Sequence, residues 1–204
     1  METDRVQAFS DGVFAFAITV LVLGITVPPE GTSLGPELLR LWPAYLAYLM
    51  SFVVIGAIWI NHHAMFRHIV RADSWVLIFN LLQLLFIAFL PFPTAVLARA
   101  FLENTDESVA TAFYGGTLAG LGVVICITWA YASRDHYLLD DKITPEKARR
   151  LMRRYLIGPV FYVLATAVGF VAPWLAVAIF VALDVYFLMP ERSRRRSVET
   201  AAKP

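Results

Sequence analysis

The sequence predicts an all-α, polytopic membrane protein built as a single repeat of six transmembrane helices. Hydrophobic residues make up 59% of the 204 residues and charged residues only 16%, against roughly 25% charged in an ordinary soluble domain. The apolar residues gather in stretches that can cross a bilayer, which takes about 17–25 helical residues. Basic residues concentrate on alternate connections between these stretches. We therefore expect one transmembrane domain over residues 1–204 and no separate soluble domain.

Six apolar stretches follow one another along the chain. The first ends at Pro28 and Pro29, because proline cannot continue a helix. Pro91 and Pro93 are expected to bend or end the third stretch at its outer side. The fourth is rich in glycine, and the last apolar run is too long for one helix, so we divide it at Pro173. The predicted spans are 9–27, 43–66, 75–98, 109–132, 155–171 and 174–189.

The positions of Lys and Arg predict the orientation of these spans. With the N-terminus inside the cell, fifteen of the 17 basic residues lie on inner segments, and only Arg40 and Arg99 lie outside. An even number of spans then places both termini in the cytoplasm. The basic tail over 190–204 is expected to anchor this topology against anionic lipid, and so short a run does not favour a nucleic-acid partner.

The inner connection over 133–154 contains the start of a helix. Thr144 suits the N-cap, Pro145 the first helical position and Glu146 the first turn. This pattern predicts that a helix begins before the apolar part of the fifth span.

Two weaker signals lie in later spans. Gly116 and Gly120 have the small-residue spacing that lets helices approach closely, which favours packing over a specific dimer contact. Asp184, near the inner end of the sixth span, is expected to extend toward the headgroups or to pair with a basic residue.

Polar side chains fall at a similar depth near the cytoplasmic ends of the first three spans. An ionisable group inside the membrane is costly unless it is paired, so each of them needs an explanation. The first span enters from inside, the second returns there and the third leaves again, so a hydrogen-bonded cluster of Asp11, a histidine and Asn80 is geometrically reasonable. The polar set comprises Arg5, Ser10, Asp11, His62, His63, Asn80 and Gln83.

Three interpretations of this cluster remain open from the sequence. It can be a structural latch that ties three helices together. It can sense protons, because histidine titrates near neutrality, or it can hold a metal ion. Adjacent histidines point to different sides of a helix, so His62 and His63 do not readily share one ion. We therefore expect no metal or other cofactor.

The first span carries a stripe of mostly apolar residues. Asp11 lies about 140° from Phe16, since five residues at about 100° each separate them. A stripe of this kind usually faces core or lipid, so periodicity alone does not indicate a pore. The hydroxyl of Thr19 at mid-depth adds little, because it can bond its own backbone. The stripe consists of Phe9, Gly12, Val13, Phe16, Thr19, Val20 and Leu23.

Three segments resemble the transmembrane protein 175 family of potassium channels, in its prokaryotic single-repeat form. The pattern Arg5-x-x-x-Phe9-Ser10-Asp11, followed by VFAFAITVLVL, looks like the signature of that family's first helix. The segments WINHHAMF (59–66) and LLQLLFIAFLPFPT (81–94) resemble its second and third helices. The later spans are similar in hydropathy only.

The resemblance implies a homotetramer of six-helix subunits in a prokaryotic plasma membrane, with four copies of the first helix lining a pore for potassium ions. The family usually has isoleucine or leucine at the constriction, where this chain has Phe16. Thr19 matches a threonine proposed to shape selectivity, and Val20 and Leu23 match apolar residues of the next layers. The implied polar network behind the pore comprises Arg5, Ser10, Asp11, His62, His63 and Asn80.

The sequence thus supports three functions. The first is a potassium-permeable cation channel with a hydrophobic gate at Phe16, which would show unitary conductance. The second is a proton-coupled secondary transporter that uses Asp11 and the membrane histidines and would show saturating flux. The third is a structural or regulatory membrane protein, or an intramembrane enzyme, which would show no ion flux. An enzyme is not expected, because no hydrolase elbow, Walker loop or His-Glu zinc pattern is present.

Overall fold

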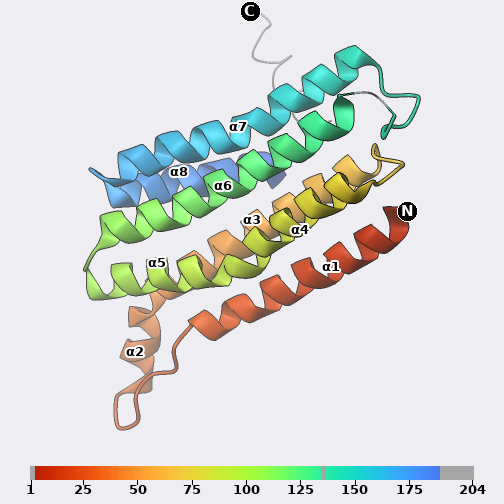
Figure 1. Cartoon of the computed structure of the whole chain (residues 1–204). Helices are drawn as coiled ribbons and strands as arrows, with labels where there is room; N and C mark the ends of the chain where they lie inside the picture. The colour runs from red at the N-terminus through yellow and green to blue at the C-terminus, as the bar shows by residue number, and fades with distance from the viewer. Residues whose placement is uncertain (1–2, 135–136, 189–204) are drawn as a thin grey trace, which may run out of the picture.

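The computed structural model describes residues 3–134 and 137–188. The regular elements of this part of the chain are all helices, which confirms the predicted fold class. Figure 1 shows long helices running side by side, with α1 along one edge of the bundle and α7 along the opposite edge. The predicted basic tail over 190–204 lies outside the described residues. The elements are α1 (Thr3–Val20), η1 (Leu21–Gly24), α2 (Leu34–Arg40), α3 (Trp42–Phe66), α4 (Ser74–Phe89), α5 (Pro91–Glu103), α6 (Glu107–Ser133), α7 (Pro145–Gly169) and α8 (Pro173–Leu188).

Six segments of the described chain account for the membrane crossings. The sixth, α8, is a shorter apolar helix. The short helix α2 lies at the end of the bundle opposite the N-terminus (Figure 1). The chain is therefore a multi-pass membrane protein, as predicted. The five segments long and apolar enough to span a bilayer are Thr3–Gly24, Trp42–Phe66, Ser74–Glu103, Glu107–Ser133 and Pro145–Gly169.

The third span is broken at Leu90, between α4 and α5. Pro91 and Pro93 have no N–H to donate to the preceding turn. The helix is therefore interrupted at the LPFPT motif, where the sequence predicts that it bends or ends. The Thr94 hydroxyl donates to the Leu90 carbonyl at 2.8 Å, and the Ser51 hydroxyl oxygen lies 2.7 Å from that of Thr94. These bonds link the hydroxyl groups of α3 and α5 beside the break, so both have partners within the membrane.

The α7 helix begins well before its apolar part. It starts at Pro145, and the Thr144 hydroxyl caps it by accepting a hydrogen bond from the Lys147 backbone N–H at 3.3 Å. The predicted helix start in the inner loop is confirmed. The predicted fifth span, which starts at residue 155, is the apolar continuation of the same helix.

The two loops at the N-terminal end of the bundle are joined to each other. Ile69 and Leu139 form an isolated antiparallel bridge between the α3–α4 loop and the α6–α7 loop. Arg71 donates to the Tyr137 carbonyl at 3.1 Å, and its guanidinium carbon lies 4.9 Å from the centre of the Tyr137 ring. Figure 1 places both loops at the same end as the N-terminus, which agrees with the predicted alternation of the connections.

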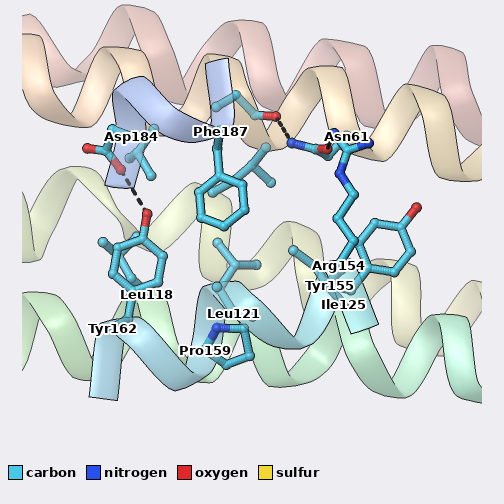
Figure 2. Close-up of a pocket in the computed structure, with 15 residues that line it drawn as sticks. Asn61, Leu118, Leu121, Ile125, Arg154, Tyr155, Pro159, Tyr162, Asp184 and Phe187 are labelled. Carbon is cyan, nitrogen blue, oxygen red and sulfur yellow. Dashed lines mark hydrogen bonds between the residues drawn. The ribbon is translucent and has the colours of Figure 1, made fainter. Parts of the chain in front are cut away.

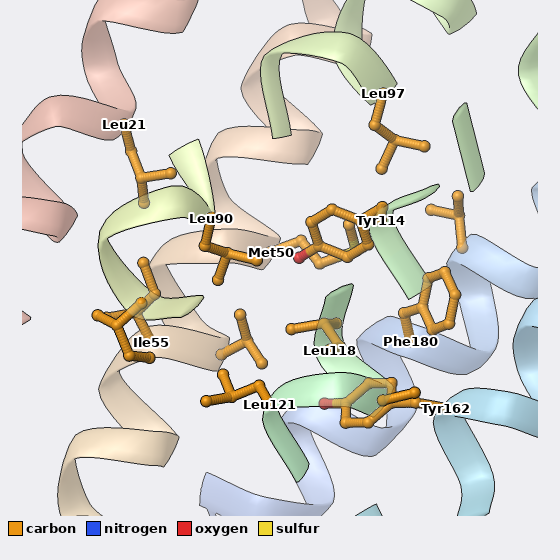
Figure 3. Packing of buried hydrophobic residues seen from close by; sticks show 14 of the residues in the cluster. Leu21, Met50, Ile55, Leu90, Leu97, Tyr114, Leu118, Leu121, Tyr162 and Phe180 are labelled. Carbon is orange, nitrogen blue, oxygen red and sulfur yellow. The ribbon is translucent and has the colours of Figure 1, made fainter. Parts of the chain in front are cut away.

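The main hydrophobic core contains side chains from α3, α5, α6 and α8. Figure 3 shows Tyr114 of α6 among Met50, Leu90 and Leu97. Tyr114 is fully buried, and its hydroxyl oxygen lies 3.0 Å from that of Ser51. The core thus reaches the hydroxyl groups at the helix break and supports the third span there.

Glycines let α6 approach its neighbours closely. A Cβ atom added at Gly115 would lie 2.7 Å from Phe180 Cζ of α8, and one at Gly122 would lie 2.8 Å from Pro159 Cδ of α7. A Cβ at Gly120 would meet the Phe86 ring, whereas one at Gly116 would meet nothing within 4 Å. The close helix contacts therefore depend on glycines beyond the predicted Gly116–Gly120 pair.

Candidate functional site

The α1 helix has one buried and one exposed face. Phe16 is 68% exposed and Leu23, in the η1 turn, is 78% exposed. An apolar face that its own bundle leaves uncovered meets either lipid or another copy of the chain. The buried residues, which recur at helical spacing on the opposite face, are Val6, Ser10, Phe14, Ala17 and Leu21.

The four residues predicted to line a pore lie along the uncovered side of α1 and η1. Phe16, Thr19 and Leu23 are exposed, and Val20 is half-buried. The Thr19 hydroxyl donates to the Phe16 carbonyl at 2.8 Å, the local bond that helical threonine often makes. The hydroxyl hydrogen is therefore engaged, and the oxygen keeps lone pairs that can accept.

A buried polar cluster lies on the opposite face of α1. Asn80 of α4 donates to the Ser10 hydroxyl oxygen at 3.1 Å, and its amide oxygen lies 2.9 Å from His62 Nε2 of α3. Ser10 also donates to the Val6 carbonyl at 2.8 Å, and the His62 ring stacks against Phe66. Ser10, His62 and Asn80 are each at most 2% exposed. The cluster thus joins α1, α3 and α4 through polar groups that all have partners.

Asp11 is bound by tryptophan. The Trp59 indole N–H donates to Asp11 Oδ1 at 2.7 Å, and both side chains lie partly open to the surroundings. Within the described residues neither His62 nor His63 forms a hydrogen bond with Asp11. The sequence analysis did not include Trp59 in the polar set, although it precedes His62 by three positions and so lies on a neighbouring part of the same helix surface.

The remaining members of the predicted network lie at its edge. His63 is exposed, with its ring centre 6.4 Å from that of Trp59, and Arg5 is exposed on the first turns of α1. Among residues 3–134 and 137–188, no group of three or more His, Cys, Asp or Glu side chains could hold a metal ion.

The expectation for Asp184 is wrong. This carboxyl does not extend toward the headgroups: it is 1% exposed, and Oδ1 accepts a hydrogen bond from the Tyr162 hydroxyl at 2.8 Å. The side chain is held inside because α3, α6 and α7 surround this part of α8. The sequence carried little signal for this pair, since the two residues lie on different helices.

The comparisons with known proteins identify the family. A family model described as endosomal/lysosomal potassium channel TMEM175 matches residues 5–91, which run from α1 to the first residue of α5. A potassium channel of Chamaesiphon minutus is 40% identical over 192 residues, which cover 92% of this chain and 94% of that protein. The chain belongs to the TMEM175 family. A potassium channel of Streptomyces collinus is 38% identical over 188 residues and covers 91% of each chain.

The fold is shared with a solved structure of the same family. The crystal structure of a lysosomal potassium-selective channel TMEM175 homolog from Chamaesiphon minutus matches with a TM-score of 0.82 at 38% identity. The match covers 91% of this chain and 95% of that one. The family resemblance drawn from the first three spans is therefore confirmed, and it extends to the later helices. TMEM175 proteins are ion channels, so this chain is not an enzyme, as predicted.

Proposed function

We propose that this TMEM175 protein is a potassium-permeable cation channel formed by four copies of the chain, with α1 of each copy lining a central pore. The observation that carries the proposal is the apolar face of α1, with Phe16 and Leu23 more than two-thirds exposed in the single bundle. Relatives named potassium channels align over nine-tenths of the chain. Four such faces around an axis would cover one another.

Phe16 forms the constriction in this proposal. Four phenylalanine rings around an axis would exclude water, because an ion there would lose its hydration and gain no ligand. Thr19 forms the next ring, with Val20 and Leu23 beyond it. Since the Thr19 hydrogen is engaged by the Phe16 carbonyl at 2.8 Å, the hydroxyl oxygen is left to attract a cation.

The polar cluster sets the rotation of α1 in the same proposal. Ser10, His62 and Asn80 hold the buried face of α1 against α3 and α4, and the bond from Trp59 to Asp11 does so at the edge. A rotation of α1 that moved Phe16 from the axis would break these bonds. We place the assembly in a prokaryotic plasma membrane, among its lipids, with both termini in the cytoplasm.

The test is the reversal potential of the purified protein in a planar bilayer under opposed K⁺ and Na⁺ gradients. We expect unitary currents whose reversal potential moves toward that of K⁺. Phe16→Ala should increase the leak and reduce selectivity. Phe161→Ala removes an exposed ring of α7, at the opposite edge of the bundle, and should change neither property.

Three results would each reject a part of the proposal. An unchanged current in Phe16→Ala would remove Phe16 from the pore. Flux that saturates with substrate, without unitary steps, would instead favour the proton-coupled transporter that uses Asp11 and the histidines. Native mass spectrometry tests the assembly separately, and a mass of one chain in conducting preparations would exclude the tetramer.

A further inference from the structure

A partly open cavity of about 70 Å³ lies between α3, α6, α7 and α8. Figure 2 shows its two polar ends, with Asp184 and Tyr162 at one end and Asn61 and Arg154 at the other. Side chains such as Phe187 line the wall between them. The lining residues of the cavity include none from α1, and Figure 1 shows α7 at the opposite edge of the bundle from α1.

Asp184 has one oxygen with a partner and one without. Oδ1 accepts from the Tyr162 hydroxyl at 2.8 Å, whereas Oδ2 is buried and has no hydrogen-bond partner among the described residues. An unpaired carboxylate in an apolar interior is far more costly than a neutral carboxylic acid. The buried side chain therefore needs a ligand for its second oxygen.

The cavity supplies room for that ligand but few groups to hold a metal ion. Hard cations need several oxygen ligands, and among the side chains of the described residues that line this end, Asp184 and Tyr162 carry the oxygen atoms. A volume of about 70 Å³ exceeds that of two water molecules at about 30 Å³ each. A proton on Oδ2 removes the charge, and the resulting O–H can donate to such a water.

We propose that Asp184 is a proton-binding site, which protons reach through water in this cavity from the end that carries Arg154. Arg154 donates to the Asn61 amide oxygen at 3.3 Å, so that end is polar enough to hold water. A second cavity of about 130 Å³ lies on another side of Asp184, between α3 and α8. Its other lining residues are all apolar, so it offers water no route.

The charged and titratable groups around Asp184 are few. Tyr162 faces it from α7, and Tyr114 of α6, whose hydroxyl oxygen lies 3.0 Å from that of Ser51, interacts with it electrostatically. The α3 residues that line the two cavities include no titratable side chain, and Arg154 is the cation in the lining of the first cavity. Among the described residues, a proton leaving Asp184 would therefore leave a charge without a direct ionic partner.

Infrared difference spectra of the full-length protein in lipid bilayers test the site directly, from mildly acidic to mildly alkaline pH. Exposed carboxyl groups stay ionised over this range, because their pKa values lie near about 4. We expect the carbonyl band of a protonated carboxylic acid that disappears as the pH rises. Asp184→Asn should lack this band, and Asp11→Asn, which changes the other carboxyl of the membrane interior described here, should keep it.

A second variant tests the proposal independently, in case Asp184→Asn does not fold. Tyr162→Phe keeps the carboxyl but removes the hydroxyl that donates to it, so the band should shift in frequency and persist to higher pH. A band that is unchanged in Asp184→Asn, or absent from the unaltered protein throughout this range, would overturn the proposal. The measurement does not depend on ion conduction, so it can fail or succeed independently of the proposed channel function.

Discussion

The two sides of the bundle are held together by different means. On the α1 side, Asn80 joins Ser10 and His62, and each of these buried groups has a partner. On the α7–α8 side, close packing around glycines dominates, and Asp184 has a partner for only one of its oxygens. The satisfied groups Ser10, His62 and Asn80 act as a latch between helices, whereas the unpaired oxygen of Asp184 borders a cavity that can hold a ligand.

The helices α1 and α6 also differ in how far they are enclosed, whereas α7 is only 17% buried and resembles α1 in this respect. In their most apolar stretches, 28% of the α1–η1 segment is buried inside the bundle, against 56% of α6. A helix covered on one face can serve an interface between subunits, while α6 is surrounded by its own subunit. The difference predicts that changes on α6 act mainly on stability, and changes on the exposed face of α1 mainly on conduction.

The largest effect on stability is expected at Gly115 of α6. Gly115→Ala places a methyl group against the half-buried Thr166 of α7 and 2.7 Å from Cζ of Phe180, which is fully buried in the core. We expect a loss of about 2–3 kcal/mol, as for overpacking of a tight core, seen as a lower midpoint of thermal unfolding by tryptophan fluorescence in detergent.

Its neighbour provides the matched control. Gly116→Ala meets nothing within 4 Å, and alanine favours a helix over glycine by up to about 1 kcal/mol. The unfolding midpoint should stay the same or rise. If both variants lose equal stability, close packing at Gly115 does not stabilise the contact between α6 and α8.

A smaller effect is expected from breaking the polar latch of the α1 side. Asn80→Leu leaves the buried His62 Nε2 without its partner and removes the donor to Ser10. Leaving such groups unpaired costs about 1–3 kcal/mol, and the same unfolding measurement should show the loss.

Gln83, one turn further along α4, tests whether a buried polar side chain stabilises the protein only when its atoms have hydrogen-bond partners. It is 1% exposed, and its Oε1 has no hydrogen-bond partner among the described residues. Gln83→Leu should therefore be neutral or stabilising, because it removes an unsatisfied polar atom. Equal losses in the Asn80 and Gln83 variants would show that the hydrogen bonds of the latch contribute little.

The fold could be predicted from sequence largely because its signals are local. The apolar runs predict the spans, the prolines predict the break beside Leu90, and Thr144 predicts the start of α7. The positions of Phe16 and Asp11 on different sides of α1 follow from the helical repeat of about 100° per residue.

The details of the two polar sites depend on contacts between distant segments. Trp59 rather than a histidine binds Asp11, and Tyr162 rather than a basic residue binds Asp184. Likewise, nothing in the adjacent pair Gly115 and Gly116 reveals which one faces Phe180. These choices are set by the rotation and separation of packed helices, which spacing within one helix does not determine.

The smallest effect is expected at Asp73, where the two sides meet at the membrane surface. Its carboxylate accepts from the Val76 backbone N–H of α4 at 2.9 Å and from the Tyr131 hydroxyl of α6 at 2.7 Å. Desolvation raises the pKa of this carboxyl, but hydrogen bonds, chiefly from Val76 and Tyr131, together outweigh it and hold the pKa below its ordinary value. The ionised form therefore contributes stability that is present at neutral pH and is lost as the pH falls through the folded-state pKa.

Two substitutions separate the charge of Asp73 from its capping role. Asp73→Asn keeps an oxygen that can cap α4, so it should cost only about 0.5 kcal/mol at neutral pH, and this difference should vanish at acid pH. Asp73→Ala also loses the cap and should cost about 1 kcal/mol, part of which remains at every pH. The unfolding midpoints of the unaltered protein and the two variants, measured from acid to neutral pH, separate the contribution of the charge from that of the cap. If the Asn variant differs from the unaltered protein by the same amount at every pH, the ionised carboxylate does not join the two sides.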